Sequence, residues 1–187
     1  MWLLTLEWLV LALLVCWSVG AYRRVQRLRA ECVQAFAELA VALHSWRAWW
    51  ALQVQVRPQA ASAAWQRWPA ALDALQPASQ RAVRDMWREG STAALEMAWR
   101  ETLHAWQADM ADAQSCDSDP RAWQHLHSQW REHDMTQRKA ALQFQAAAQR
   151  YNQAIAQWPA VLLVRVRGWT PLRPFLHDAV PLAQPSV

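Results

Sequence analysis

The fold is decided by residues 1–22, MWLLTLEWLVLALLVCWSVGAY. This stretch carries no charged side chain from Trp8 to Tyr22, and Glu7 is the only charge before them. Its length matches the about 20 apolar residues that a helix needs to cross the hydrocarbon core of a bilayer. We therefore expect residues 1–22 to form a transmembrane anchor, with tryptophans suited to the interfacial aromatic belts.

The basic residues that flank the anchor lie on one side of it only. Arg23, Arg24, Arg27 and Arg29 follow it, whereas no Lys or Arg precedes it. Because basic flanks stay in the cytoplasm, this asymmetry predicts a single-pass signal-anchor with the N-terminus outside and the rest of the chain cytoplasmic. Two alternatives stay open: a secretory signal cleaved after residues 19–21, although its basic n-region is missing, and a buried core helix of a soluble protein.

The composition favours an all-α protein. Only 3 of the 187 residues are Gly, and β-branched residues are scarce outside 161–166. The net charge of +4 comes from arginines scattered among acidic residues, which argues against a nucleic-acid partner. Cys16, Cys32 and Cys116 form no C-x-x-C pair and predict neither a disulfide nor a zinc site. The 15 tryptophans fall mostly on apolar helical positions, so we interpret them as packing residues.

Apolar residues at steps of three and four predict three long helices, at 22–57, 78–114 and 120–158. Nothing breaks a helix between Gly20 and Arg57, so the membrane helix should continue straight into the first of them. Gly90 predicts a kink or interruption in the second. The pair Asp119-Pro120 is a strong start signal for the third.

The remaining segments are expected to be short or irregular. Three prolines between residues 58 and 77 predict a bent cap of short helical pieces, and Ser115–Asp119 predicts a turn. The chain then divides into an anchor at 1–22, a helical bundle at 23–159 and a proline-containing, extended or irregular tail at 160–187.

Three arms of nearly equal length predict an elongated, coiled-coil-like, up-down antiparallel bundle of three long helices plus short cap helices. On this model Ser115–Asp119 lies near the bilayer, and Leu162–Trp169 packs over the distal cap around Trp65 and Trp68. If residues 58–77 instead form a full-length arm, the tail returns to the bilayer, where its apolar and basic residues would suit an interfacial segment.

The motifs G-x-x-x-x-G-K-[ST], H-E-x-x-H and G-x-S-x-G do not occur in the chain, and three glycines cannot build a glycine-rich phosphate loop. His125 and His127 are two residues apart and would face different directions on a helix. The acidic residues around the predicted turn lack the Gly and Glu of a calcium loop. His133 and Gln137 place polar groups on an apolar seam, where we expect a hydrogen-bonded layer; a ligand or proton site is the alternative.

Two stretches together resemble the LemA family of bacterial membrane-anchored helical proteins. The N-terminal match includes Tyr22, Leu28, Arg29 and Phe36, and the C-terminal match includes Tyr151, Asn152, Ile155, Trp158 and Pro159, followed by Gly168, Trp169 and Pro171. Arg23 and Ala40 depart from the family pattern, and the middle of the chain does not align with it. The resemblance implies an anchored helical bundle of the bacterial inner membrane, with no catalytic residues to carry over.

These observations predict a membrane-anchored scaffold or adaptor without catalytic activity or cofactor. Its partners would be the bilayer, through residues 1–22, and a protein partner or a second copy, with no nucleic acid and no small-molecule substrate. The alternatives are a non-catalytic subunit of a membrane enzyme complex with a polar site near His133 and Gln137, or a secreted soluble helical bundle after signal cleavage. Tyr151 and Trp158 are expected to be buried anchors of the last turns of the bundle.

Overall fold

The computed structural model describes residues 2–56, 63–88, 90–115, 120–158 and 160–175. They form helices α1 (Trp2–Val56), α2 (Ala63–Arg84), α3 (Ser91–Ser115), α4 (Pro120–Ala156) and α5 (Ala160–Arg167). No strand occurs in these parts of the chain, so the all-α prediction is confirmed.

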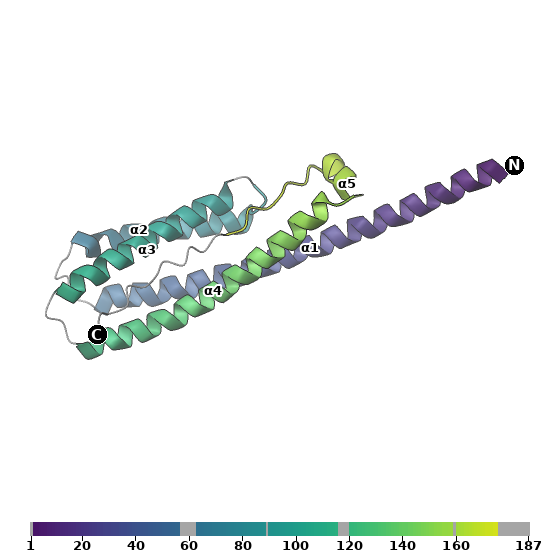
Figure 1. The fold of residues 1–187 in the computed structure, drawn as a ribbon. Helices are drawn as coiled ribbons and strands as arrows, with labels where there is room; N and C mark the ends of the chain where they lie inside the picture. The colour runs from purple at the N-terminus through teal and green to yellow at the C-terminus, as the bar shows by residue number, and fades with distance from the viewer. Residues whose placement is uncertain (1, 57–62, 89, 116–119, 159, 176–187) are drawn as a thin grey trace.

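Helix α1 is a single helix of 55 residues, as the absence of a breaker between Gly20 and Arg57 predicted. Its first part projects alone from the body of the protein (Figure 1). From Val25 onward it buries one stripe at steps of three and four, which includes Cys32, Phe36, Leu39 and Trp46. The first part of α1 therefore has no packing partner within the described chain along most of its length, whereas the second part contributes to the core of the body.

The body consists of two close helix pairs (Figure 1). Helix α1 packs along α4, and α2 packs along α3. Small side chains meet where α1 and α4 pack together, since Ala140 of α4 lies with Ala37 and Ala42 of α1 in one groove between the two helices. The side chains that separate one helix pair from the other are larger, so the two pairs lie farther apart than the helices within each pair.

A layer of indole rings fills the space between the pairs. We call it the tryptophan layer: Trp46 and Trp50 of α1, Trp99 and Trp106 of α3, and Trp130 of α4. The rings of Trp106 and Trp130 stack at 4.6 Å, and the Trp46 ring meets that of Trp99 edge-on at 4.7 Å. All five side chains are buried, so the interpretation of the tryptophans as packing residues holds for this group.

The prediction of a bent cap at 58–77 is wrong for the part that the structure describes. Helix α2 begins at Ala63 and continues through Pro69 and Pro77 to Arg84. Its buried face, Leu72, Leu75, Ala78 and Ala82, packs on α3 and on α1, and this burial offsets the hydrogen bonds that the prolines cannot donate. Residues 57–62 lie outside the described parts.

The single long helix predicted at 78–114 is also wrong, because a turn separates α2 from α3. Gly90 adopts a positive φ of 88°, and its carbonyl accepts the Ala94 N–H at 2.9 Å, which makes it the residue before the first turn of α3. The Ser91 hydroxyl donates to the carbonyls of Asp85 and Arg88 at 2.6 and 2.8 Å. The predicted interruption at Gly90 is therefore a complete reversal of the chain.

The predicted irregular structure after residue 159 is in part a helix. Helix α5 ends at Arg167 and is followed by Gly168, whose φ is +64°; the Trp169 N–H donates to the Val164 carbonyl at 3.2 Å. That bond across a left-handed glycine is the Schellman ending, which satisfies a carbonyl in the last turn. Residues 168–175 then run in an irregular path along the body, toward the α2–α3 turn (Figure 1).

The described part of the body contains four long helices, α1 to α4, instead of the three that were predicted. The chain after α4 therefore lies at the opposite end of the body from the predicted one. Helix α4 returns to the base of the projecting helix, where the Trp158 ring lies 4.3 Å from that of Trp17. Trp169 stacks on Tyr22 there at 5.8 Å. The predicted packing of Leu162–Trp169 over a distal cap is therefore wrong, and Ser115 ends α3 at the opposite end of the body (Figure 1). Residues 116–119 and the side chains of Trp65 and Trp68 lie outside the description.

Candidate functional site

The C-terminal segment is held at the base of the body by a group of polar and aromatic side chains. We call this group the basal clamp: Tyr22 and Arg29 of α1, Trp87 of the α2–α3 turn, Tyr151 and Asn152 of α4, and Trp169 and Thr170 after α5. It joins three distant parts of the sequence at one level of α1.

Arg29 lies at the centre of the basal clamp. Its guanidinium carbon is 4.0 Å from the centroid of the Trp87 ring and 5.6 Å from that of Trp169. A planar cation between two indole faces gains electrostatic attraction as well as contact area. Arg29 therefore links the α2–α3 turn to the C-terminal segment.

Asn152 fixes the C-terminal segment by two reciprocal hydrogen bonds. Its side-chain amide donates to the Leu172 carbonyl at 2.7 Å, and its side-chain oxygen accepts the Leu172 N–H at 2.8 Å. The Tyr151 hydroxyl donates to the Thr170 carbonyl at 3.2 Å, and the Thr170 hydroxyl donates to the Trp87 carbonyl at 3.3 Å. Side chains therefore supply the hydrogen bonds that an irregular backbone cannot make with itself.

Two titratable groups at this end of the body are shifted by burial. Burial raises the pKa of the Cys32 thiol to about 11, with a further contribution from the negative charge of Glu31. Burial also raises the pKa of the Tyr151 hydroxyl, and the charge of Arg29 opposes this effect. Both groups are neutral at physiological pH, which suits packing and hydrogen bonding.

The residues of the N- and C-terminal motifs occupy related places in the structure. Tyr22, Arg29, Tyr151 and Asn152 meet in the basal clamp. The others that the structure describes as buried lie in the core beside it: Leu28, Phe36 and Ile155. Sequence analysis missed Trp87 and Leu172 as partners of this group. A tryptophan between Asp85 and Gly90, in a turn that would otherwise be solvated, is the signal that could have found one of them.

Trp158 does not have the buried position predicted for it. Its side chain is 59% exposed and lies after the end of α4, against Trp17 of the projecting helix. The reason is the return of α4 to the base of the projecting helix, beyond the core. Pro159 lies outside the described residues.

His133 and Gln137, the two residues of the predicted polar seam, both lie in α4. Gln137 is fully buried, and the His133 ring lies 5.3 Å from that of Trp49, whose indole N–H donates to the Gln129 side chain at 3.1 Å. No group of three His, Cys, Asp or Glu side chains that could hold a metal ion occurs among the described residues. The seam is thus a polar patch bordering the tryptophan layer.

His127 lies at the edge of the tryptophan layer. Burial lowers the pKa of its imidazole, with a second contribution from the charge of Arg131. Its ring lies 6.4 Å from that of Trp106, whereas His125 is exposed. The two histidines therefore have different surroundings, as their spacing predicted.

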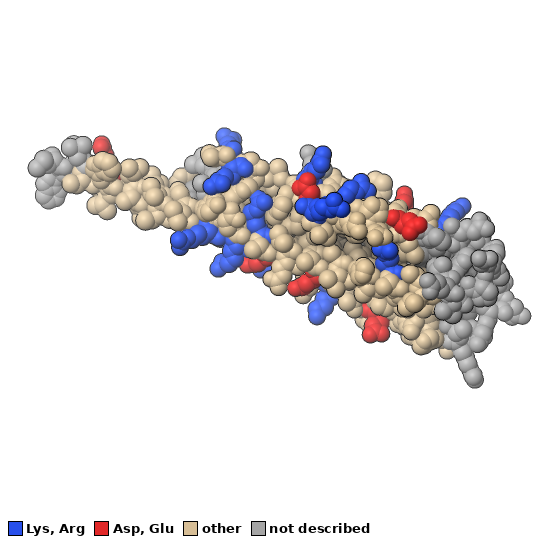
Figure 2. Space-filling view, turned by 180° about the vertical axis from the view of Figure 1, so that it is seen from behind, with Lys and Arg blue, Asp and Glu red and all other residues tan. Residues whose placement is uncertain are grey.

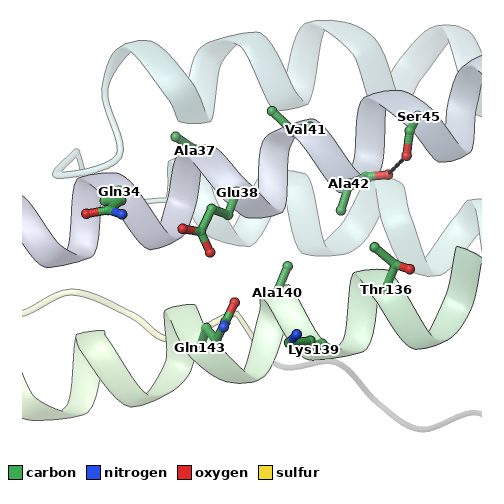
Figure 3. A pocket seen from close by; sticks show the side chains of 10 residues that line it. All are labelled: Gln34, Ala37, Glu38, Val41, Ala42, Ser45, Thr136, Lys139, Ala140 and Gln143. Atoms are coloured by element: carbon green, nitrogen blue, oxygen red, sulfur yellow. Dashed lines mark hydrogen bonds between the residues drawn. The ribbon is translucent and has the colours of Figure 1, made fainter.

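A shallow groove of about 540 Å³ runs between α1 and α4 (Figure 3). Ala42 of α1 and Ala140 of α4 point into the space between the two helices, and Ala37 and Val41 complete the apolar part of the lining (Figure 3). None of its lining residues belongs to α2 or α3.

The groove carries one charge of each sign on opposite walls. Glu38 of α1 points toward α4, and Lys139 lies on the α4 side (Figure 3). Val41 is 69% exposed, and its side chain lies on the side of α1 away from α4 (Figure 3). The groove is thus an uncovered, largely apolar surface with a charge on each edge.

Comparison of the chain with protein-family models, curated proteins and solved structures finds no significant match. The resemblance to the LemA family therefore stays a prediction from two stretches of sequence.

Proposed function

We propose that this protein is a single-pass, membrane-anchored helical scaffold with a cytoplasmic body, similar in plan to the LemA family and without catalytic activity of its own. The observation that carries the proposal is α1. One unbroken helix is apolar and bare over its first part and contributes a core stripe to the body over its second part.

The bare part of α1 supports a membrane rather than a core environment. None of its most apolar 18-residue window is buried, and among the described helices only α1 has the length and composition to cross a membrane. Trp8 is 70% exposed and Leu13 is 71% exposed. A soluble protein rarely exposes so large an apolar surface, whereas lipid would cover it.

Extraction with alkaline carbonate tests the anchor. The full chain should stay with membranes, and Leu9→Lys combined with Leu13→Lys should release it, because two charges in the span are expensive. Val83→Lys combined with Met97→Lys places the same charges on exposed apolar positions of α2 and α3, so it should stay membrane-bound. Release of the parent chain, or a mature N-terminus at Tyr22, would contradict the proposal.

We further propose that the α1–α4 groove binds a second copy of the chain. Two copies inserted in the same orientation are related by a two-fold axis along the membrane normal, and such an axis places α1 of one copy against α4 of the other. Glu38 and Lys139 line the same groove, so each carboxylate then faces the other copy's ammonium group. This charge complementarity favours a second copy over an unrelated helix.

A charge swap tests this pairing. Chemical crosslinking in membranes should capture a dimer of the parent chain, and Glu38→Lys should weaken it by placing like charges together. Adding Lys139→Glu to Glu38→Lys restores opposite charges and should restore the dimer. Loss in both variants, or loss in neither, would contradict the pairing while leaving the anchor untouched.

A further inference from the structure

The base of the projecting helix contains a cavity that the scaffold role does not use. It has a volume of about 330 Å³ and lies between α1 and the end of α4. Its lining includes Trp17, Gly20 and Arg24 of α1, and Ala154, Gln157 and Trp158 at the other side.

The walls of this cavity have two chemical characters. Trp17 and Trp158 form an apolar aromatic wall, with ring centroids 4.3 Å apart and both side chains partly exposed. Gly20 leaves open space, since a Cβ added there would meet nothing within 4 Å. Arg24 supplies a positive charge at the same level. Aromatic rings beside a cation suit a ligand that has an apolar part and an anionic part.

The base of the projecting helix carries many positively charged side chains (Figure 2). Blue side chains gather where the narrow N-terminal helix joins the wider body, and the arginines near this level are Arg23, Arg24 and Arg27 of α1 and Arg165 and Arg167 of α5.

The nearby carboxylate does not neutralise this group. Glu31 lies 4.0 Å from Arg27 and 3.4 Å from Arg150, so it is already shared by two arginines. Within the described chain Arg24 makes no ion pair with a carboxylate. Its guanidinium is thus available to an anion from outside the protein.

We infer that this cavity binds an anionic phospholipid of the bilayer, with the phosphate on Arg24 and the glycerol and upper acyl chain against Trp17 and Trp158. The inference rests on the proposed membrane anchor, because that anchor places residues 17–24 at the level of the headgroups. Arginine forms strong, directional hydrogen bonds with phosphate oxygens, and indole rings favour the interface between headgroups and hydrocarbon. The protein therefore recognises a headgroup charge in addition to crossing the bilayer.

The experiment uses the full chain in vesicles of phosphatidylcholine, with and without phosphatidylglycerol. Flotation with phosphatidylcholine vesicles alone tests the anchor. Native mass spectrometry after mild detergent extraction from the mixed vesicles then measures which phospholipid stays bound. We expect phosphatidylglycerol to be retained in preference to phosphatidylcholine, and millimolar inorganic phosphate to leave that retention unchanged.

Two variants and a control locate the site. Arg24→Gln removes the charge, and Gly20→Leu adds a bulky apolar side chain to the cavity lining, at a position where a Cβ meets nothing within 4 Å. Each should lower retained phosphatidylglycerol at least fivefold while flotation is unchanged. Arg131→Gln makes the same charge change at an exposed position in the first half of α4 and should have no effect.

Three outcomes would overturn the inference while the anchor stands: equal retention of both phospholipids by the parent chain, unchanged retention in Arg24→Gln and Gly20→Leu, or displacement of the lipid by inorganic phosphate. Failure of the parent chain to float would instead reject the anchor, and the inference with it.

Discussion

Asn152→Leu should release the C-terminal segment from the body. Asn152 makes both hydrogen bonds that join α4 to Leu172, at 2.7 and 2.8 Å, and leucine has nearly the same size with neither donor nor acceptor. A hydrogen bond of this kind contributes about 0.5–1.5 kcal/mol, so the pair contributes roughly 1–3 kcal/mol. The segment should then open roughly 5- to 150-fold more often.

Hydrogen exchange measures this opening directly. Pro171 and Pro174 carry no amide hydrogen, so a peptide spanning residues 169–175 reports on few amides, and the Leu172 N–H is the one that Asn152 accepts. Exchange in this peptide should accelerate by the factor given above, while exchange in the buried part of α1 should not change. Gln149→Leu, at an exposed position on the same helix, is the matched control and should behave as the parent chain does.

Two results would refute the reasoning. If the 169–175 peptide exchanges at the same rate in Asn152→Leu and in Gln149→Leu, Asn152 does not hold the C-terminal segment. If exchange rises by the same factor in α1 and α4, the segment is not a separate unit, and the basal clamp belongs to the global core.

Three further predictions concern the body. Trp130→Ala removes a buried ring of the tryptophan layer and should lower the free energy of unfolding by roughly 3–5 kcal/mol, with Val83→Ala as an exposed control in thermal unfolding. Arg29→Gln loses two ring contacts and should cost about 1–2 kcal/mol in the same assay, whereas Arg27→Gln, whose side chain is 76% exposed, should be nearly neutral. The folded-state pKa of Cys32 is about 11 against an ordinary value of 9.0, so the unfolded chain loses its proton first and stability should fall between pH 9 and 11; Cys32→Ala should flatten that part of a denaturation profile measured against pH.

The sequence was sufficient for elements with long, uninterrupted apolar stripes. Helices α1 and α4 have such stripes, and their predicted bounds agree closely with Trp2–Val56 and Pro120–Ala156. The error lay where proline was taken as a break. Leu72, Leu75, Ala78 and Ala82 already follow helical steps across Pro77, but the burial that holds α2 together comes from α3, and sequence alone did not reveal that pairing.

The candidate sites were less accessible to sequence reasoning. The number of long helices decides at which end of the body the chain leaves the bundle. Because one helix was missed, Trp158 and Trp169 were predicted at the far end of the body, whereas they lie at the base of the projecting helix. The Asn152–Leu172 hydrogen bonds involve an irregular segment, whose path no periodicity describes. The Glu38 and Lys139 walls of the groove are exposed polar positions, which are ordinary on any single helix and become a surface only when α1 and α4 lie together.

Because α1 is continuous, its number of residues fixes how the outer half of the helix is rotated relative to the body. An α-helix turns about 100° and rises 1.5 Å with each residue, and α1 has no break among its 55 residues. One residue inserted before Trp17 would therefore rotate the outer half of the helix by about 100° relative to the body. Seven residues would nearly restore the original direction while lengthening the helix by about 10 Å. The number of residues between the outer part of α1 and the body thus sets the direction of the α1–α4 groove relative to the side chains of that outer part.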